Sequence, residues 1–199
     1  MNLVKLNREF YLRDTLTVSK DLLGKILVCK SEDGVTKGRI VEAEAYIGPG
    51  DAASHAYKNL NSSRTAIQFG EGGYAYIYLI YGMYNCMNIV TSTYGRPESV
   101  LIRALEPIES IDIMEKRRGT NKLKNLCSGP GKLCQAMGIS KSQYGIDLCG
   151  DSLYLEYDSL CKEPFQISTS KRINIAYAGE AKDYEWRFCV KDSIYLSVK

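Results

Sequence analysis

The chain lacks the closely spaced cysteine and histidine ligands that a zinc site would need. Its 199 residues include a single histidine, His55, and seven cysteines, none of them in a C-x-x-C pair. Zinc sites take closely spaced Cys and His ligands, so we expect no zinc site. We also expect no other metal and no cofactor. An odd number of scattered cysteines favours free, reduced thiols in a cytoplasmic protein. They are Cys29, Cys86, Cys127, Cys134, Cys149, Cys161 and Cys189.

The chain also lacks the signals of secretion and of membrane insertion. The first thirty residues contain no basic start followed by a long apolar run and a small-residue cleavage site, so no signal peptide is expected. The uncharged run from Gly72 to Gly95 holds Asn85 and Asn88 and places tyrosines at its centre. Tyrosines of membrane-spanning helices concentrate at the two interfaces, so we expect no contact with a membrane.

Size and composition favour one globular domain. Hydrophobic residues make up 45% of the chain and charged residues 25%, which is ordinary for a globular protein. A chain of 199 residues can bury a sizeable core as one large domain or as two very small ones. We find no repeat, low-complexity tract or linker, and we therefore expect a single, monomeric domain over residues 1–199.

The positive charge is concentrated in one segment. The net charge is +3, yet residues 114–141 hold seven basic side chains and one acidic side chain, so this segment carries +6 and the remainder −3. The basic side chains are Lys116, Arg117, Arg118, Lys122, Lys124, Lys132 and Lys141. Such a stretch is typical of proteins with a polyanionic partner, although a solvated basic face would look the same.

Strand and helix patterns are interspersed without a regular βαβ rhythm, which indicates an α+β (mixed α/β) fold. Strands are predicted at 25–30, 37–47, within 74–90, at 99–104 and near 153–157, 172–177, 186–190 and 193–198. Helices are predicted after a cap at Thr17, from Pro107 to Gly119 and within 128–139. The turn SEDG predicts that the first two strands form an antiparallel pair.

Tyrosines gather in the stretch YAYIYLIYGMYNCMN at residues 74–88. Tyr74, Tyr76 and Tyr78 alternate with aliphatic residues, so a strand would place the three rings on one face. An ordinary core strand would not need large side chains on both faces. An aromatic face can instead stack on bases or sugars.

The tyrosine alternation breaks at Gly82, which predicts a turn or a bulge. A hairpin tip at this position would expose Tyr81 and Met83, an aromatic ring and a flexible thioether. Bulky side chains at an exposed tip can wedge between the base steps of DNA.

A second strand pattern, GRIVEAEAYIG, carries two carboxylates. One face of this strand holds Ile40, Glu42, Glu44 and Tyr46. The opposite face is small and apolar enough to pack against a core. Both carboxylates therefore project away from that packing, and for Glu42 we expect a solvent-facing position. His55 follows Glu44 by eleven residues, beyond a Gly/Pro turn, and is a candidate for the same site.

Four motifs resemble the alkyladenine (3-methyladenine) DNA glycosylase family, of the type that acts through a tyrosine hairpin. They are VEAEAYIGPGDAASHA, YIYLIYGMYNCMN, LIRALEP and LCSGPGKLCQAMGI. The likeness extends from DLLGKILV to EWRF, which is nearly the whole chain. It implies a single domain with a curved antiparallel sheet, flanking helices and a protruding hairpin that enters the minor groove.

The resemblance also implies an activity and a partner. The partner would be double-stranded DNA with damaged purines, such as 3-methyladenine, 7-methylguanine, hypoxanthine or etheno-adenine. The activity would be base-excision repair by a monofunctional DNA glycosylase without metal or cofactor. A base within a duplex must be extruded before its glycosidic bond can be attacked.

Individual residues match the family's functional positions. Glu44 matches the base that activates the attacking water, and Arg103 matches the residue that holds this water or the adjacent phosphate. Tyr46, His55 and Tyr78 match the walls between which the flipped base stacks. Cationic alkylated purines would be attracted to the faces of these rings.

Other matching positions would shape the pocket and the DNA contact. Ala45 would line the base pocket, and Asn88 would crowd the place where guanine carries its amino group. Tyr81 would fill the gap left in the duplex, with Met83 beside it. The side chains expected to contact phosphates are Lys132 and Arg117. Residues 59–71 depart from the family pattern, which has a threonine-proline-arginine segment and a proline before the glycines.

Two other protein classes share parts of this pattern. A glycoside hydrolase could use paired carboxylates and sugar-stacking tyrosines, but Glu42 and Glu44 would lie only about 6.7 Å apart along one strand face. The two flanks of a sugar need carboxylates from different elements. A non-catalytic nucleic-acid-binding module would use the basic segment and the tyrosines, but it would have no use for Glu44.

Overall fold

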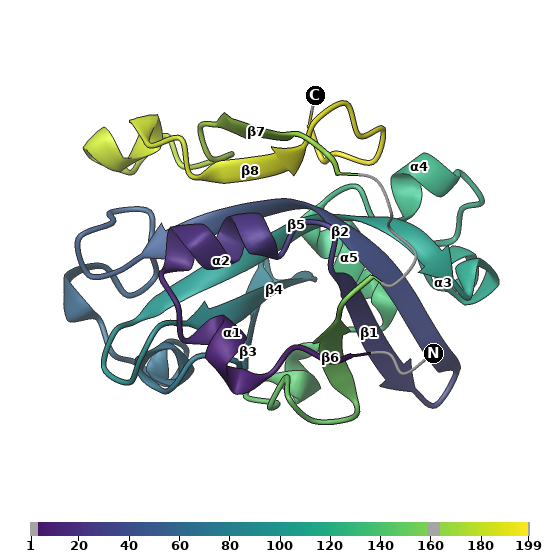
Figure 1. The fold of residues 1–199 in the computed structure, drawn as a ribbon, viewed down its shortest axis with the longest axis horizontal. Coiled ribbons are helices and arrows are strands. Elements are labelled where there is room, and N and C mark those ends of the chain that lie inside the picture. The colour runs from purple at the N-terminus through teal and green to yellow at the C-terminus, as the bar shows by residue number, and fades with distance from the viewer. Residues whose placement is uncertain (1–3, 159–163, 199) are drawn as a thin grey trace.

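A computed structural model describes residues 4–158 and 164–198 (Figure 1). The strands are β1 (Ile26–Ser31), β2 (Gly34–Ile47), β3 (Ala75–Ile80), β4 (Tyr84–Thr91), β5 (Glu98–Glu109), β6 (Leu153–Glu156), β7 (Ile167–Ser170) and β8 (Arg187–Val190). The α-helices are α1 (Arg8–Tyr11), α2 (Thr15–Asp21), α3 (Ile111–Arg118), α4 (Leu123–Leu126) and α5 (Pro130–Met137). The 3₁₀ helices are η1 (Tyr57–Asn59), η2 (Ala66–Phe69), η3 (Lys141–Gln143) and η4 (Gly179–Asp183). Cys161 lies outside the described residues, and the six described cysteines are free thiols, five of them buried.

One antiparallel sheet organises the chain. Its neighbouring strands follow the order β3-β4-β5-β2-β1-β6. The long strand β2 uses two partners along one edge: residues 34–39 pair with β1, and residues 42–44 pair with β8, which also pairs with β7. The first part of β2 therefore continues into β1, and the later part continues into β8 and β7. In Figure 1, β7 and β8 lie above the rest of the sheet.

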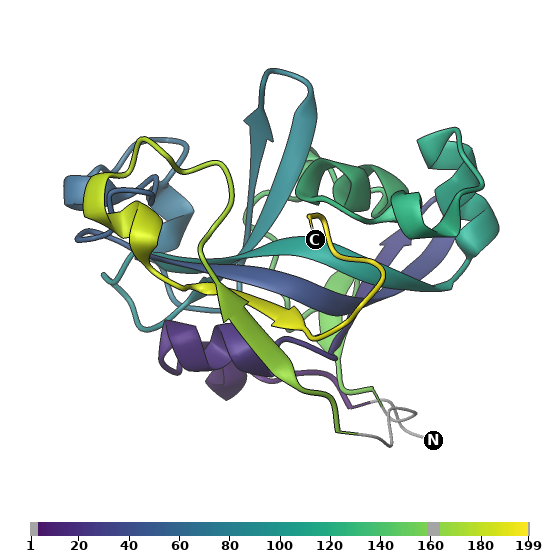
Figure 2. The same ribbon diagram turned by 90° about the horizontal axis from the view of Figure 1, so that it is seen from above.

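Helices cover both faces of the sheet. Figure 2 shows α1 and α2 (purple) on one side of the central strands and α3, α4 and α5 (green) on the other, where the β3–β4 hairpin projects. Residues from both sides join the main core, among them Val18 of α2, Ile102 of β5 and Leu133 of α5. The predicted α+β fold with flanking helices and a protruding hairpin is confirmed. No helix within residues 4–158 or 164–198 is long and apolar enough to cross a membrane.

Helix α2 begins earlier than predicted because a different residue caps it. Asp14 Oδ1 accepts hydrogen bonds from the Thr17 N–H (2.9 Å) and the Thr17 hydroxyl (3.0 Å). An aspartate at this position satisfies one of the free N–H groups of the first turn. Thr17, predicted to be the cap, therefore lies inside that turn.

The helix predicted from Pro107 also begins elsewhere, because β5 continues to Glu109. Pro107 lies opposite Gly38, where the register between β5 and β2 shifts. A proline has no N–H to donate, and sheets accept it at such irregular positions. Helix α3 starts after Ser110, whose backbone is left-handed (φ 57°), and ends at Gly119 as predicted.

Two late segments predicted as strands, 172–177 and 193–198, are loops. In the first, the N–H of Ile173 donates to a glutamate side chain. In the second, the N–H of Ser197 does the same. Side-chain carboxylates thus satisfy backbone groups that a neighbouring strand would otherwise pair.

Candidate active site

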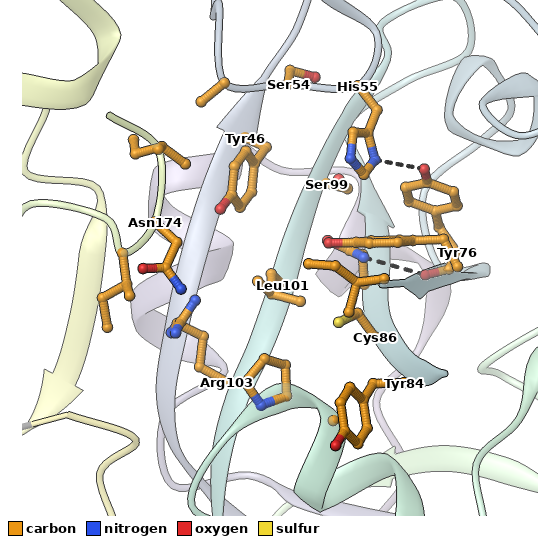
Figure 3. Close-up of a pocket in the computed structure, with 18 of the residues that line it drawn as sticks. Tyr46, Ser54, His55, Tyr76, Tyr84, Cys86, Ser99, Leu101, Arg103 and Asn174 are labelled. Atoms are coloured by element: carbon orange, nitrogen blue, oxygen red, sulfur yellow. Dashed lines mark hydrogen bonds between the residues drawn. The ribbon is translucent and has the colours of Figure 1, made fainter. Parts of the chain in front are cut away.

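A cavity of about 380 Å³ opens on one face of the sheet, beside the hairpin (Figure 3). Its floor consists of alternate residues of neighbouring strands. They are Tyr76, Tyr78 and Ile80 from β3, Tyr84, Cys86 and Asn88 from β4, Ser99, Leu101 and Arg103 from β5, and Tyr46 from β2. Because side chains alternate along a strand, and Asn88 and Glu44 both lie opposite Leu101, these side chains share one face.

Loops close the cavity around this floor. They contribute Ser54 and His55 after β2, Pro130 and Gly131 at the start of α5, and Ile173, Asn174 and Ile175 before η4. In Figure 3, Tyr46 and Asn174 lie on one side of the cavity, and His55 and Tyr76 lie on the other. The size is typical of pockets for small ligands. Within residues 4–158 and 164–198, no three His, Cys, Asp or Glu side chains are grouped so that they could hold a metal ion.

Glu44 is fully buried behind three residues that line the cavity. Its Oε2 accepts hydrogen bonds from the Tyr46 hydroxyl (2.8 Å) and from Arg103 Nη1 (3.1 Å). Its Oε1 accepts one from the Ile173 N–H (2.8 Å). A carboxylate offers about four acceptor positions, so these donors leave one position on Oε1.

Burial and charge act in opposite directions on Glu44. Removal from water raises the pKa of Glu44 above its ordinary value, and the Arg103 guanidinium opposes this rise. Burial alone would lower the pKa of Arg103, but the two neighbouring carboxylates raise it, so the guanidinium stays charged. Burial also raises the pKa of the Tyr46 hydroxyl, which therefore remains a donor. Arg103 is thus the main counter-charge for Glu44 when this carboxyl group is ionised.

Two compensating β-bulges place Arg103 between two carboxylates. The register between β2 and β5 shifts on each side of Glu42, with Val41 as the extra residue in one shift and Arg103 in the other. Bulges next to active sites re-aim side chains. Here Arg103 reaches Glu42 through Nε (3.2 Å) and Glu44 through Nη1 (3.1 Å).

Glu42 is buried, so the solvent-facing position predicted for it is wrong. Strand β8 and a later loop cover this part of β2. Glu42 Oε1 accepts from Arg103 Nε, from Arg187 Nε (2.8 Å) and from the Ser197 hydroxyl (2.7 Å), and Oε2 accepts from the Ser197 N–H (2.6 Å). Four donors thus engage Glu42 behind β8, and Glu42 shares the Arg103 guanidinium with Glu44. Two carboxylates that share one guanidinium do not flank a sugar from opposite sides, which argues against the paired carboxylates of a glycoside hydrolase.

His55 lines the cavity and is held by two neighbours. Its Nδ1 lies 2.7 Å from the Tyr76 hydroxyl, and its Nε2 accepts from the Arg64 guanidinium at 3.2 Å. An accepting Nε2 assigns the ring proton to Nδ1, which then donates to Tyr76. Burial lowers the pKa of His55 to about 4, with a further contribution from the Arg64 charge. The ring is therefore neutral at neutral pH, and it meets Tyr78 edge-on, with 4.6 Å between the ring centroids.

The other predicted pocket and hairpin residues divide between the cavity and its surroundings. Asn88 lines the cavity, and its amide donates to the Tyr76 carbonyl at 3.3 Å. Tyr81 at the hairpin tip is 76% exposed and borders the cavity, whereas Met83, 66% exposed, is not part of its lining. The prediction that Ala45 lines the pocket is wrong, because its side chain points to the other face of β2 and joins the core.

Of the two basic residues predicted to contact phosphates, Lys132 belongs to α5, whereas Arg117 belongs to α3 and contacts the other end of α5. Lys132 is in the first turn, next to Gly131 at the rim of the cavity. Arg117 lies at the far end, where its guanidinium donates to the Ala136 carbonyl (3.1 Å) and contacts the Asp33 carboxylate (3.3 Å). These bonds hold the Arg117 guanidinium against the protein, so the structure argues against the phosphate contact predicted for it.

Arg172 is a residue of the site that the sequence patterns missed. It is buried and donates to both oxygens of Asp51 (2.5 Å and 2.8 Å). Its guanidinium carbon lies 4.7 Å from the centroid of the Tyr46 ring. This ion pair anchors the loop that brings Ile173 to the cavity side of β2. The only local signal was an apolar alternation that predicted a strand.

Arg64 is a second residue that was missed. Its guanidinium carbon lies 4.8 Å from the centroid of the Tyr78 ring, and its side chain donates to His55. Arg64 belongs to the polar segment 59–71, where the family likeness is weakest. A single arginine in a polar loop has no periodic pattern that would mark it.

Comparison with known proteins connects these residues to a family. A family model of methylpurine-DNA glycosylase (MPG) matches residues 9–194. A relative named 3-methyladenine DNA glycosylase, from Clostridium novyi, is 55% identical over 98% of this chain and 99% of its own length. A relative of the same name from Alkaliphilus oremlandii is 52% identical over 98% of this chain and 100% of its own length. The chain therefore belongs to the methylpurine-DNA glycosylase family.

Proposed function

We propose that this DNA glycosylase extrudes a damaged purine from duplex DNA and hydrolyses its N-glycosidic bond with a water that Glu44 activates. The proposed substrates are alkylated or deaminated purines of the 3-methyladenine, 7-methylguanine, hypoxanthine and etheno-adenine class. One observation carries the proposal. The buried carboxylate of Glu44 lies behind a tyrosine-lined cavity and is held by three donors that line it. The active unit is the whole chain, residues 1–199, acting as a monomer.

The hairpin tip would supply the wedge that keeps the base out of the helix. Tyr81 is largely exposed and borders the cavity mouth. Extruding a base costs a few kcal/mol of stacking and pairing, and a ring inserted into the vacated space offsets part of that cost. Met83, exposed on the same tip, would contact the neighbouring base step.

Neutral aromatic walls suit a cationic base. The faces of Tyr46 and Tyr78 attract cations, and His55, with a pKa of about 4, carries no charge that would repel one at neutral pH. The Tyr78 ring already holds a cation, the Arg64 guanidinium, at 4.8 Å. A base that stacks on Tyr78 would therefore take the place of this guanidinium.

Glu44 would act as the general base. The remaining acceptor position on Oε1 can take a hydrogen bond from water, and Arg103 favours the ionised form that accepts a proton. As the water oxygen bonds to the anomeric carbon of the sugar, its proton passes to Glu44, and the electron pair of the breaking bond leaves with the base. The carboxylate also stabilises the positive charge that develops on the sugar. A cationic purine leaves as a neutral molecule and needs no proton at this step. A neutral purine such as hypoxanthine leaves as an anion, which takes a proton from water.

Asn88 would separate guanine from its damaged relatives. It is 3% exposed, lines the cavity and is fixed by the Tyr76 carbonyl. A fixed side chain does not move aside for the exocyclic amino group, which guanine has and hypoxanthine lacks. Crowding of this kind discriminates by about 1–3 kcal/mol.

Lys132 would hold the DNA backbone close to the lesion. It lies in the first turn of α5, whose N-terminus borders the cavity and carries no side-chain cap. Free N–H groups at a helix N-terminus favour phosphate. The backbone of the damaged strand would thus pass over the start of α5.

Release of free base from a lesion-containing duplex tests the proposal. Glu44→Gln keeps the size of the side chain but cannot take a proton. We expect single-turnover excision to fall by about 10²- to 10⁴-fold, with lesion binding close to wild type. Glu32→Gln, in the exposed β1–β2 turn, is the matched control and should retain full activity. Excision retained by Glu44→Gln would contradict the proposed function.

A further inference from the structure

The segment 193–198 is bonded to a carboxylate behind the active site. The Ser197 N–H donates to Glu42 Oε2 (2.6 Å), and the Ser197 hydroxyl donates to Oε1 (2.7 Å). The Val198 carbonyl accepts from Arg187 Nη2 (2.8 Å), and Arg187 Nε donates to Glu42 (2.8 Å). A charged network thus joins this segment to Glu42, which has no part in the chemistry described above.

Glu42 is connected in turn to the reacting centre. Arg103 bridges the two carboxylates, with Nε on Glu42 (3.2 Å) and Nη1 on Glu44 (3.1 Å). A guanidinium is planar, so contacts at two of its nitrogens fix its orientation. Both carboxylates are 0% exposed and Arg103 is 7% exposed, so water does not compete for these bonds.

We propose that Glu42 is a positioning residue, clamped by Ser197 and Arg187, that holds Arg103 against Glu44. Ser197 and Val198 would then support glycosidic cleavage without contacting the flipped base. This inference rests on the proposed role of Glu44 and extends it to a segment at the other end of the chain.

The number of donors to Glu42 determines how strongly Arg103 is bound to Glu42 and how strongly to Glu44. When a buried carboxylate loses a donor, its negative charge must be stabilised by the donors that remain. Without the Ser197 hydroxyl, Glu42 would draw Arg103 towards itself and weaken the bond from Arg103 to Glu44. Because the Arg103 charge lowers the pKa of Glu44, that pKa would rise.

Other titratable and charged groups also face Glu44. They are Glu42 and Tyr46 on β2, Arg103 on β5, Arg187 and Cys189 on β8, and Arg172 on the loop before η4. Burial holds the pKa of Tyr46 well above its ordinary value and raises that of Cys189 to about 11, so neither changes charge near neutral pH. A shift in the pH profile would therefore report on the arginine–carboxylate network.

The test is single-turnover excision of hypoxanthine from a duplex, measured between about pH 5 and about pH 9. For Ser197→Ala we expect a plateau rate about tenfold lower, an acid limb shifted to higher pH and an unchanged Kd for the lesion duplex. Ser193→Ala is the matched control, because it makes the same change in the same segment. The Ser193 hydroxyl accepts from the Tyr195 N–H (3.3 Å) and does not bond to Glu42. We expect wild-type behaviour from it.

Glu42→Gln should give the opposite shift. The Glu42 charge raises the pKa of Glu44, so its removal should move the acid limb to lower pH. The plateau rate should still fall, since a neutral amide holds Arg103 less firmly than a carboxylate. A general loss of stability would not move the acid limb in opposite directions in Ser197→Ala and Glu42→Gln. Opposite shifts in these two variants would therefore support the positioning role of Glu42.

Two results would overturn the inference. One is a Ser197→Ala enzyme with an unchanged rate. The other is a rate that falls only in step with the folded fraction in a thermal melt, with the acid limb unmoved. Either result would leave the proposed function standing if Glu44→Gln were inactive, whereas excision by Glu44→Gln would count against the proposed function itself.

Discussion

The protonation state of His55 sets the charge of the cavity wall. It is the chain's one histidine, so its ring signals can be followed by NMR without overlap. We expect a titration midpoint near pH 4. Arg64→Ala should raise this midpoint, because the Arg64 charge lowers the pKa of His55. Lys58→Ala, which removes an exposed cation that contacts Tyr57 instead, should leave it unchanged. A wild-type midpoint near the ordinary value of about 6.5 would contradict the assignment of a half-buried, neutral ring.

The same low pKa has a consequence for stability. The pKa of His55 is about 4 in the folded chain, and about 6.5 is expected in the unfolded chain. Between these values the unfolded chain binds more protons, so the free energy of unfolding should fall as the pH drops from about 6.5 to about 4. Denaturant melts of wild type and His55→Gln, which has no ring to titrate, would measure the contribution.

Asn88 permits a test of selectivity at a single side chain. Asn88→Ala removes the group that we expect to crowd the amino group of guanine. Release of guanine and 7-methylguanine should rise about tenfold relative to hypoxanthine, measured as free base from matched duplexes. Asn125→Ala, an exposed amide in α4, should leave the ratio unchanged. An unchanged ratio in Asn88→Ala, with both rates reduced, would mean that Asn88 supports the fold and does not select the base.

The hairpin is the element whose role in extrusion is most directly testable. Tyr81→Ser should impair excision from a well-paired duplex more than excision opposite a mismatch or an abasic site, where extrusion costs less. Tyr94→Ser, an equally exposed ring (83%) on the β4–β5 loop, is the control. Equal losses in all duplex contexts would show that Tyr81 is not the wedge.

The elements that carry the cavity could be predicted from local pattern. Period-2 alternation places Tyr76 and Tyr78 on one face of β3, and Glu44 and Tyr46 on one face of β2, because a strand permits only two side-chain directions. A glycine at the break of the alternation marked the tip, and Gly82 there has a positive φ of 69°. These features depend on neighbours in sequence, and they appear in the structure as expected.

The elements that cover the carboxylates could not be predicted in this way. A glutamate on an amphipathic strand is read as solvent-facing, and nothing near Glu42 in sequence indicates otherwise. Its partners Arg187 and Ser197 lie 145 and 155 residues away. The helix start predicted at Pro107 was wrong for a related reason. A proline after a strand pattern usually indicates the start of a helix, and the register shift that lets a strand accept it cannot be seen in the sequence. Long-range packing decided both positions.

At the scale of the whole molecule, the basic segment 114–141 contains two cations, Lys132 and Arg117, that can be compared as a test residue and its control. Lys132 follows Gly131, which lies at the rim of the cavity, whereas Arg117 is bonded to Ala136 and Asp33. Lys132→Ala should weaken binding equally for all lesions and reduce the slope of log K against log salt by about 1. Arg117→Ala should leave that slope unchanged and lower the melting temperature instead. A salt slope that falls in Arg117→Ala and not in Lys132→Ala would reverse the assignment.

Strand β2 pairs with β1, which precedes it in the chain, and with β8, which is close to the C-terminus. This arrangement has a consequence for the synthesis of the protein on the ribosome. Most of the cavity lining comes from residues 46–131, whereas one wall of the cavity and three donors to Glu42 and Glu44, namely Ile173, Arg187 and Ser197, come from residues 172–198. At about 5–20 residues per second, a ribosome would need on the order of several seconds to add the late part. During that interval the nascent chain lacks this wall and these donors, and we expect it to be inactive. A premature stop codon before Ile173 would make that inactive state permanent.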